Sequence, residues 1–254
     1  MEQAPYFSVV TCTWNSATYL PECIESLLQQ DFHDFELVFV DAGSDDGTLA
    51  YIDAIPWPRK TVLNGVRGGI SKAMNAGIEA ARGQVVMHLH SDDYLAHPRV
   101  LSRVAQVMAR GQGRWLYGRT LTRINASISP ETPDFPDFSY GRLLRGNVVP
   151  HPATFVERAL YREVGGFDET LKYAMDYDMW LRIARDWPPV QLREFLSVFR
   201  KHGGSTTYAN RLASFDEDYR VRCRYTAGMP LTRLSNALRY WMRRRKLEPS
   251  MAAP

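Results

Sequence analysis

Three carboxylates follow apolar runs that have the composition of buried strands. Asp92 and Asp93 come shortly after residues 85–89, and Asp41 follows residues 35–40. Open α/β sheets bind ligands beyond the carboxyl ends of their parallel strands, so these side chains are expected at one crevice. Adjacent carboxylates repel each other, and a hard divalent cation shared with a phosphate would compensate. A surface turn is the alternative for the pair, because Asp and Ser favour turns.

Asp41 lies at the same predicted edge as Thr11, which is in the first apolar run. A carboxylate there can accept a hydrogen bond from a nucleobase N–H group or from a ribose hydroxyl. An equal alternative is that Asp41 caps the helix predicted to start near Thr48. We expect Asp45 and Asp46 to act as caps.

Lys72 falls in the first turn of a helix that Gly68 and Gly69 precede. A cation is unfavourable there, because it lies beside the positive end of the helix dipole. The mismatch indicates a neighbouring anion such as a diphosphate, and a solvated lysine is the alternative.

Asp176 begins a helical pattern in which Met179, Trp180 and Ile183 can pack inward. One interpretation is a general base aimed at the hydroxyl group of an acceptor. The other is a carboxylate that caps the helix and complements its dipole. The sequence around Asp176 does not decide between them.

His202 lies in the segment 200–205, between two cations and two glycines, which suits a loop that binds a polyanion. A neutral imidazole could add a third ligand to a metal held by Asp92 or Asp93. An ordinary surface histidine is the alternative.

The composition is that of a globular protein with one large domain, or with one domain and an appendage. The chain has 254 residues, of which 45% are hydrophobic and 23% charged. The net charge of +3 is weak, and no basic stripe with interleaved aromatic residues runs through the predicted core, so nucleic acid is not an expected partner.

The cysteines and the N-terminus indicate a cytoplasmic setting. Cys12, Cys23 and Cys223 form an odd set without metal-binding spacing, which favours a reducing compartment. The first residues lack the pattern of a signal peptide, and no apolar run is long enough to span a bilayer.

Strand and helix patterns alternate along the chain, which predicts an α/β fold with a mostly parallel central sheet flanked by helices. Residues 120–150, interrupted by prolines, are expected to be an irregular connection. We predict a domain over 1–210 and a helical, basic extension over 211–254. The predicted strands are 7–13, 35–40, 61–63, 85–89, 153–156 and 191–199, and a helix is predicted near 175–186.

The C-terminal extension has the pattern of a basic amphipathic helix. It could lie peripherally on an anionic membrane, on the cytoplasmic face. Alternatively, its apolar stripe packs on the domain and its basic residues are solvated. The stripe consists of Leu231, Leu234, Leu238, Trp241 and Met242, and the basic residues are Arg233, Arg239, Arg243, Arg244, Arg245 and Lys246.

Four segments, in this order and spacing, resemble the inverting glycosyltransferases of family 2, whose fold is called GT-A. Residues 40–48, Val-Asp-Ala-Gly-Ser-Asp-Asp-Gly-Thr, are similar to the family's Val-Asp-Asp-Gly-Ser-x-Asp-Gly-Thr loop. The resemblance covers roughly residues 6–206. The other segments are 7–15, the pair 69–77 and 89–95, and 151–184.

The resemblance implies a transfer of sugar from a nucleoside-diphosphate sugar, with a UDP-sugar favoured, to the hydroxyl of a saccharide or lipid-linked saccharide in polysaccharide or glycolipid synthesis. Mn²⁺ or Mg²⁺ would assist the reaction. The implied roles are nucleotide-sugar binding by Thr11, Thr13, Asn15, Asp41, Lys72 and Asp92, metal binding by Asp92, Asp93 and His202, and general-base catalysis by Asp176.

Some positions depart from the family pattern. His90 replaces a frequent Asp, Met175 replaces the Glu that usually precedes the base, and Met74 replaces a common Arg, so phosphate contact would fall to Lys72 or Arg67. Two other functions therefore stay open: a catalytically silent module that binds nucleotide-sugars, and a nucleotidyltransferase.

Overall fold

A computed structural model describes residues 3–132, 134–203 and 210–247. Strands and helices alternate in the first half, as the sequence predicts. The elements of this half are β1 (Phe7–Thr13), α1 (Leu20–Leu28), β2 (Phe35–Asp41), α2 (Thr48–Ala54), β3 (Lys60–Asn64), α3 (Ile70–Ala80) and β4 (Val85–His88).

The second half mixes short strands with longer helices and ends in two helices. Its elements are β5 (Tyr94–Leu95), α4 (Val100–Met108), β6 (Trp115–Ile124), β7 (Ser127–Pro130), α5 (Tyr140–Leu143), the short 3₁₀ helix η1 (His151–Ala153), β8 (Thr154–Glu157), α6 (Arg158–Glu163), α7 (Met175–Asp186), β9 (Val190–Lys201), α9 (Arg211–Tyr225) and α10 (Pro230–Leu247).

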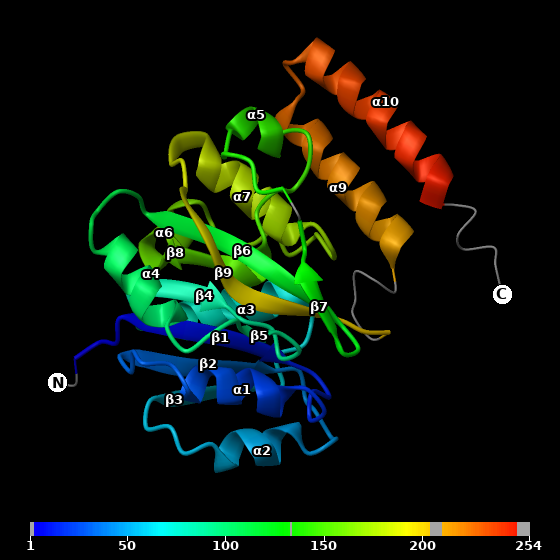
Figure 1. Ribbon diagram of the computed structural model, residues 1–254. Helices are drawn as coiled ribbons and strands as arrows, with labels where there is room; N and C mark the ends of the chain where they lie inside the picture. The colour runs from blue at the N-terminus through cyan, green and yellow to red at the C-terminus, as the bar shows by residue number, and fades with distance from the viewer. Residues whose placement is uncertain (1–2, 133, 204–209, 248–254) are drawn as a thin grey trace.

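One sheet joins the strands in the order β3-β2-β1-β4-β8-β6-β9-β5, with β7 paired to β6. The first four strands of this order are parallel, and the register pairs Thr13 with Asp41. Both strands therefore end level with each other, at the same edge of the sheet. The antiparallel pairing of β5 with β9, Tyr94 opposite Val198, brings the end of β9 to the loop that follows β4. Figure 1 shows β9 ending on the side toward which β1 and β2 run.

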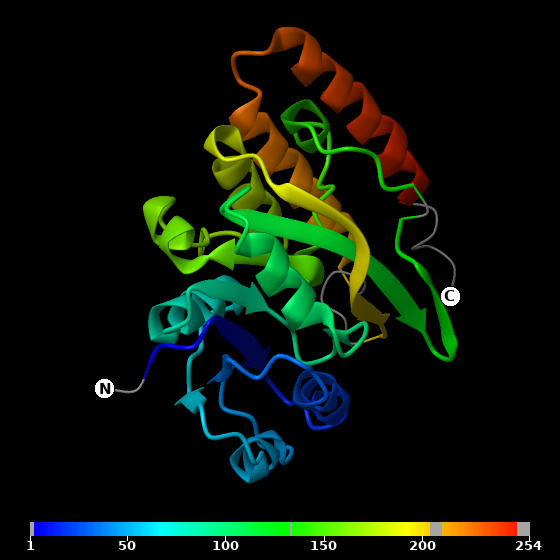
Figure 2. The ribbon, with the colours of Figure 1, turned by 60° about the vertical axis from the view of Figure 1, so that its left-hand side comes forward.

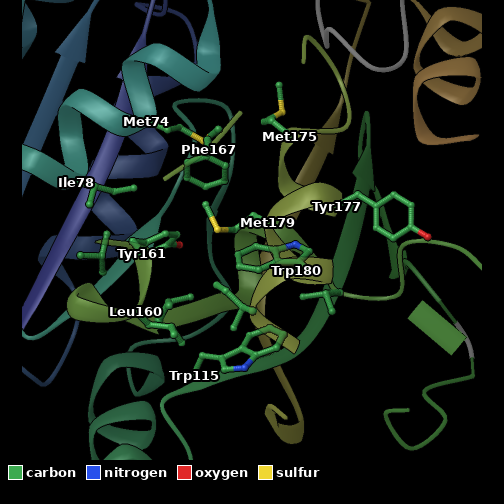
Figure 3. Close-up of a cluster of buried hydrophobic side chains, with 14 of the residues drawn as sticks. Met74, Ile78, Trp115, Leu160, Tyr161, Phe167, Met175, Tyr177, Met179 and Trp180 are labelled. Carbon is green, nitrogen blue, oxygen red and sulfur yellow. The ribbon is translucent and has the colours of Figure 1, made fainter. Parts of the chain in front are cut away.

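Helices cover both faces of the sheet and bury two apolar clusters. The apolar faces of α1, α2 and α4 pack on one side, and those of α3 and α7 pack on the other. In Figure 3, Met74 and Ile78 of α3 and Trp180 of α7 converge above Trp115 of β6. The rings of Trp115 and Trp180 stack with centroids 5.6 Å apart. This packing fixes the position of α7, the helix that carries Asp176.

The prediction of an irregular connection over residues 120–150 is wrong for its first part. β6 continues to Ile124 and returns as β7 in an antiparallel hairpin that pairs Ile124 with Ser127. The two-residue turn contains Asn125 at φ 53°, a left-handed conformation that Asn tolerates better than most residues. Of the prolines that signalled irregularity, Pro130 is the last residue of β7, where it lies opposite Leu121, and Pro136 lies in the segment that leads to α5.

The two C-terminal helices pack in succession on the domain. Val221 of α9 is fully buried in the cluster that contains α7, and α10 packs on α9. Figures 1 and 2 both show α10 on the outside of the molecule. No helix in the described ranges is both long and apolar enough to cross a membrane. The domain boundary at residue 210 stays a prediction.

Gly77 of α3 tests how closely this helix must approach the sheet. A Cβ atom at Gly77 would lie 2.3 Å from Cγ1 of Val10, so the Gly77→Ala variant overpacks the contact between α3 and β1. We expect a loss of about 1–3 kcal/mol of unfolding free energy, measured by urea denaturation. Gly141→Ala in α5 is the matched control, because nothing lies within 4 Å of its added Cβ. Equal denaturation midpoints for the two variants would contradict the expectation.

Candidate active site

The carboxylate of Asp41 organises the loop that follows β2. It accepts hydrogen bonds from Thr13 Oγ1 (2.7 Å), from the Gly43 and Ser44 amides (2.8 and 2.7 Å), and from Ser44 Oγ (2.6 Å). Burial raises the pKa of Asp41, but these hydrogen bonds outweigh it, so the pKa lies below its ordinary value. The side chain is ionised and fully engaged by the protein, and its contact with a nucleotide stays a prediction.

The loops after β1 and β2 brace each other. The Asn15 amide donates to Ser44 Oγ (2.9 Å), and Asn15 Oδ1 accepts from the Asp45 amide (3.1 Å). Asn15 adopts φ 49°, which turns the chain directly after β1. Beside it, Trp14 is 71% exposed and offers an apolar ring at this edge.

Thr11 and Thr13 differ in their surroundings. The hydroxyl of Thr11 is buried without a hydrogen-bond partner, whereas that of Thr13 is spent on Asp41. Thr11 is a buried residue of β1, and its predicted role in nucleotide binding stays a prediction.

Asp46 lies beside the start of α2 but is not its N-cap residue, which is Gly47 and has no side-chain cap hydrogen bond. The Asp46 carboxylate accepts from the Thr48 amide and hydroxyl, and its other oxygen accepts from the Ala17 amide. Asp46 therefore holds the β1 and β2 loops together as well as the helix start.

The loop after β4 joins the same edge through two contacts. Ser91 Oγ donates to Ser16 Oγ at 2.9 Å, which links this loop to the one after β1. Asp92 Oδ2 lies 3.0 Å from Nε2 of His202, which follows β9. The sequence placed these two residues at one metal site, and the structure brings them together.

Asp93 points the other way. It is 1% exposed, and its Oδ1 accepts a hydrogen bond from the Arg200 amide at 3.0 Å. Burial, followed by the charge of Asp92, raises its pKa well above the ordinary value. Burial therefore disfavours the ionised form that a hard cation binds, and the metal role predicted for Asp93 stays a prediction.

Arg200 of β9 holds the acidic pair in this arrangement. Its Nε donates to the Asp92 carbonyl (3.0 Å), and its Nη2 pairs with Glu22 of α1 (2.5 Å). The guanidinium lies over the Tyr19 ring, 4.8 Å from the centroid. One cation therefore connects α1, the loop after β4 and the end of β9.

Asp92 and His202 are suited to share a divalent cation. Two ligands at right angles around Mg²⁺, each about 2.1 Å from the ion, lie about 3 Å apart, which matches the separation of their nearest atoms. The described residues contain no group of three or more His, Cys, Asp or Glu side chains placed to hold a metal. The remaining positions would then go to water and to phosphate oxygens.

Two cations flank this edge after β3. The Val66 amide donates to the Asp41 carbonyl (2.9 Å), and Arg67 Nε donates to the Ala42 carbonyl (3.1 Å). Lys72 is exposed in the first turn of α3, with its aliphatic chain against Gly68. It makes no hydrogen bond or ion pair within the described residues, so its charge is available to a ligand.

Asp176 lies in the first turn of α7. Asn147 Nδ2 donates to its Oδ2 (3.1 Å), and the Tyr177 amide donates to its Oδ1 (2.7 Å). Burial raises the pKa of Asp176 to about 6, although both hydrogen bonds oppose the shift. The helix cap itself is Ala174, so capping does not account for this carboxylate.

A stack of histidines joins the two halves of the site. The ring of His151 lies 5.1 Å from that of His90, two residues before Asp92, and 5.9 Å from Trp180, one turn after Asp176. Burial, with a smaller contribution from neighbouring histidines, lowers the pKa of His151 well below the ordinary value, so the ring is neutral. These ring contacts connect the loop that carries the acidic pair to α7, the helix that carries Asp176.

Sequence reasoning missed several residues of this edge. Tyr19, Glu22 and Asn147 stand in segments without a recognisable motif, and only the fold brings them to the site. Arg200 was noted only as a cation beside His202. Exposure of an aromatic ring such as Trp14 cannot be read from a sequence.

Comparison with known proteins identifies the family of this chain. The family model described as "Glycosyl transferase family 2" matches residues 8–145. A PGL/p-HBAD biosynthesis glycosyltransferase of Mycobacterium bovis is 33% identical over 183 residues, 70% of each chain. Chondroitin synthase of Pasteurella multocida is 28% identical over 83% of this chain, which spans only 22% of that synthase's length.

Solved structures share the fold. S. aureus TarS 1-349 in complex with UDP-GlcNAc has a TM-score of 0.69 and 23% identity, covering 85% of this chain and 65% of that one. The mannosyltransferase PcManGT of Pyrobaculum calidifontis, in complex with GDP-Man and Mn²⁺, has a TM-score of 0.61 and 17% identity, covering 93% and 74%. The family match over more than half of the chain, with the mycobacterial relative, shows that this chain belongs to glycosyl transferase family 2, a family of glycosyltransferase enzymes.

Proposed function

We propose that this chain transfers a sugar from a nucleoside-diphosphate sugar to an acceptor hydroxyl, with inversion at the anomeric carbon. The observation that carries the proposal is the histidine stack, which connects the loop of Asp92 to the helix of Asp176. A UDP-sugar is the favoured donor. The structure of TarS with UDP-GlcNAc has a TM-score of 0.69 against this chain, which is higher than the 0.61 of PcManGT with GDP-Man. A catalytically silent binding module is not favoured, because binding alone does not require a carboxyl whose pKa is raised to about 6, as that of Asp176 is.

The donor would lie across the edge formed by the loops after β1, β2 and β4. Thr13, Asn15 and Asp41 would support the nucleotide, with Thr11 beneath them. Asp92 and His202 would hold Mn²⁺ or Mg²⁺, which neutralises the charge that builds on the diphosphate as it departs. Lys72 and Arg67 would add positive charge on the other flank.

Asp176 would act as the general base. With its pKa raised to about 6, the carboxylate is ionised at neutral pH and still basic enough to accept the proton of the attacking hydroxyl. The hydroxyl attacks opposite the leaving diphosphate, so the configuration inverts. The Asn147 side chain keeps one carboxylate oxygen in place during this step.

The acceptor would be a saccharide or a lipid-linked saccharide. The lipid-linked form is favoured, because α10 has the surface of a membrane-binding helix. Its apolar stripe is exposed: Leu231 is 82% exposed, Leu234 59% and Trp241 56%. Asn236 and Tyr240 face the protein instead, so the stripe does not pack on the domain. Exposed arginines and Lys246 flank the stripe, which suits the cytoplasmic, anionic surface of a membrane.

The Asp176→Asn variant should lose transfer while it keeps the affinity for donor. Loss of general-base assistance costs about 10²–10⁴ in rate, and the amide keeps the size and the hydrogen bond from Asn147. Turnover of UDP-GlcNAc and calorimetry with UDP give the two readouts. The wild-type rate should also fall as the pH drops below about 6, because the base then becomes protonated.

Asp186→Asn is the control for this variant, because Asp186 ends the same helix and pairs with Arg185 at the surface. It should leave both the rate and the pH profile unchanged. Wild-type turnover by folded Asp176→Asn protein would remove Asp176 from the role of base.

The adjacent acids should respond differently to amide substitution. Asp92→Asn removes a proposed metal ligand and should weaken Mn²⁺-dependent UDP binding by at least about tenfold. Asp93→Asn replaces a buried carboxyl that is bonded to the Arg200 amide and should leave that binding nearly intact. Calorimetry with UDP, with Mn²⁺ and with a chelator, measures both. The opposite ranking of the two variants would assign the metal to Asp93.

Membrane binding can be tested by flotation with vesicles of neutral lipid, with and without phosphatidylglycerol. The protein should float only with the anionic vesicles, and added salt should release it. Each exposed arginine near such a surface contributes about 1 kcal/mol, so the double variant Arg239→Glu with Arg243→Glu should bind much less. Leu234→Ser with Leu238→Ser tests the apolar stripe. Equal flotation of wild type, both double variants and a chain that ends near Pro230 would refute the proposal.

A further inference from the structure

A buried side chain of α9 holds the segment that leads into α7. Oε2 of Glu217 accepts hydrogen bonds from the backbone amides of Lys172 (3.0 Å), Tyr173 (2.5 Å) and Ala174 (2.9 Å). Glu217 is 5% exposed, so these bonds form away from bulk solvent. The last of the three amides belongs to the N-cap residue of α7, and Asp176 follows two residues later.

The carboxylate of Glu217 supplies to the start of α7 what the N-cap residue does not. Ala174 has no side-chain hydrogen bond to the first turn, and the helix dipole favours a negative charge at this end. Hydrogen bonds to a charged acceptor are strong, and loss of the acceptor leaves buried donors without partners. The direction in which α7 starts, and with it the position of Asp176, therefore depends on Glu217.

A second contact of α9 holds the segment that supplies the partner of Asp176. Three successive carbonyls at the end of α5 each accept a hydrogen bond from a side chain of another helix. The pairs are Tyr177 with Leu143 (2.5 Å), Asn236 with Leu144 (2.9 Å), and Arg222 with Arg145 (2.9 Å). Asn147, which donates to the Asp176 carboxylate, comes two residues after the last of these carbonyls.

One helix therefore contacts both segments that orient Asp176. Glu217 of α9 bonds to the segment before α7, and Arg222 of α9, which is 5% exposed, bonds to the segment after α5. Tyr225, at the end of α9, donates to Asp178 of α7 at 2.7 Å and fixes the two helices against each other. Figure 1 shows α9 lying between α7 and α10.

We propose that Glu217 and Arg222 are positioning residues for Asp176, so that α9 is part of the catalytic unit and not an appendage to it. This inference rests on the proposed function, in which Asp176 is the general base. Each residue acts through backbone groups: Glu217 sets the start of the helix that carries the base, and Arg222 sets the segment from which Asn147 reaches it. Loss of either contact should lower kcat and leave donor binding intact.

Glu36 offers a matched control for Glu217. It is also a buried glutamate, and its Oε1 accepts from the backbone amides of Arg82 (2.6 Å) and Gly83 (3.3 Å). It lies near the start of β2, at the opposite end of that strand from Asp41. Loss of its carboxylate should destabilise the fold without moving the base, so the pair of variants separates positioning from a general loss of stability.

The first test measures amide hydrogen exchange and needs no ligand. Exchange at residues 172–174 should be at least about tenfold faster in Glu217→Ala, because the amides lose a charged acceptor. Glu217→Gln keeps one acceptor oxygen and should give an intermediate rate. Glu36→Gln should instead speed exchange at Gly83. Wild-type exchange at 172–174 in folded Glu217→Ala protein would overturn the role of Glu217.

The second test follows the ionisation of Asp176 by ¹³C NMR of protein labelled at the aspartate carboxyls, with the signal assigned from Asp176→Asn. The hydrogen bond from Asn147 lowers the pKa of Asp176. Arg222→Met, which frees the segment that carries Asn147, should therefore move the titration to higher pH, whereas Glu36→Gln should leave it unchanged. An unchanged or lower midpoint in folded Arg222→Met protein would overturn the role of Arg222.

The third test measures hydrolysis of UDP-GlcNAc. Glu217→Ala should lower kcat about 100-fold, because small misplacements of a catalytic group are that costly, while the KM for UDP-GlcNAc should not change. Glu217→Gln should restore part of the rate, and Glu36→Gln should keep the wild-type kcat. Equal kcat values for folded Glu217→Ala and Glu36→Gln would contradict the positioning role.

The Asp176→Asn variant distinguishes failure of this inference from failure of the proposed function. If Asp176→Asn loses turnover while the Glu217 and Arg222 variants keep it, the positioning role fails and the general base stands. If Asp176→Asn itself keeps full turnover, the proposed function fails. The two ligand-free tests decide the positioning role if the wild type does not hydrolyse UDP-GlcNAc.

Discussion

The repulsion between the adjacent carboxylates of Asp92 and Asp93 is the constraint on which the site depends. The structure resolves it by pointing them in opposite directions. Asp93 turns inward and accepts a hydrogen bond from the Arg200 amide, and burial raises its pKa well above the ordinary value, while Asp92 lies beside His202. Arg200 is needed for both, because its backbone serves Asp93 and its guanidinium anchors the Asp92 carbonyl. The end of β9 is thereby fixed beside the loop that follows β4.

This arrangement shows why the sequence predicts some parts of the site and not others. Asp41, Asp92 and Thr13 follow apolar runs of strand composition, and parallel register alone brings such positions to one edge. Their side-chain directions were not predictable in the same way. Two neighbouring acids look equivalent in a motif, and only packing against Arg200 shows that one is buried and the other is not.

The fold was predictable to a similar extent. Periodicity identified the strands and helices of the first half, and α7 was predicted with the bounds that are observed. The hairpin of β6 and β7 was not predicted, because Pro130, at the end of β7, and the prolines after it favoured an irregular connection. The contacts of α9 had no local signal: Glu217 lies in a helix whose sequence gives no reason to expect its hydrogen bonds to residues 172–174. Long-range pairing of a helix end with a distant turn is set by the shape of the whole domain.

The position of α9 also connects the chemistry to the outer helix. One side of α9 holds the segments that orient Asp176, and the other packs on α10 through Tyr240, which donates to Asp216. If α10 lies on a membrane, α9 becomes the layer between the lipid surface and the acceptor side of the site. α9 thus connects the segment that precedes Asp176 to α10, whose exposed stripe faces away from the domain.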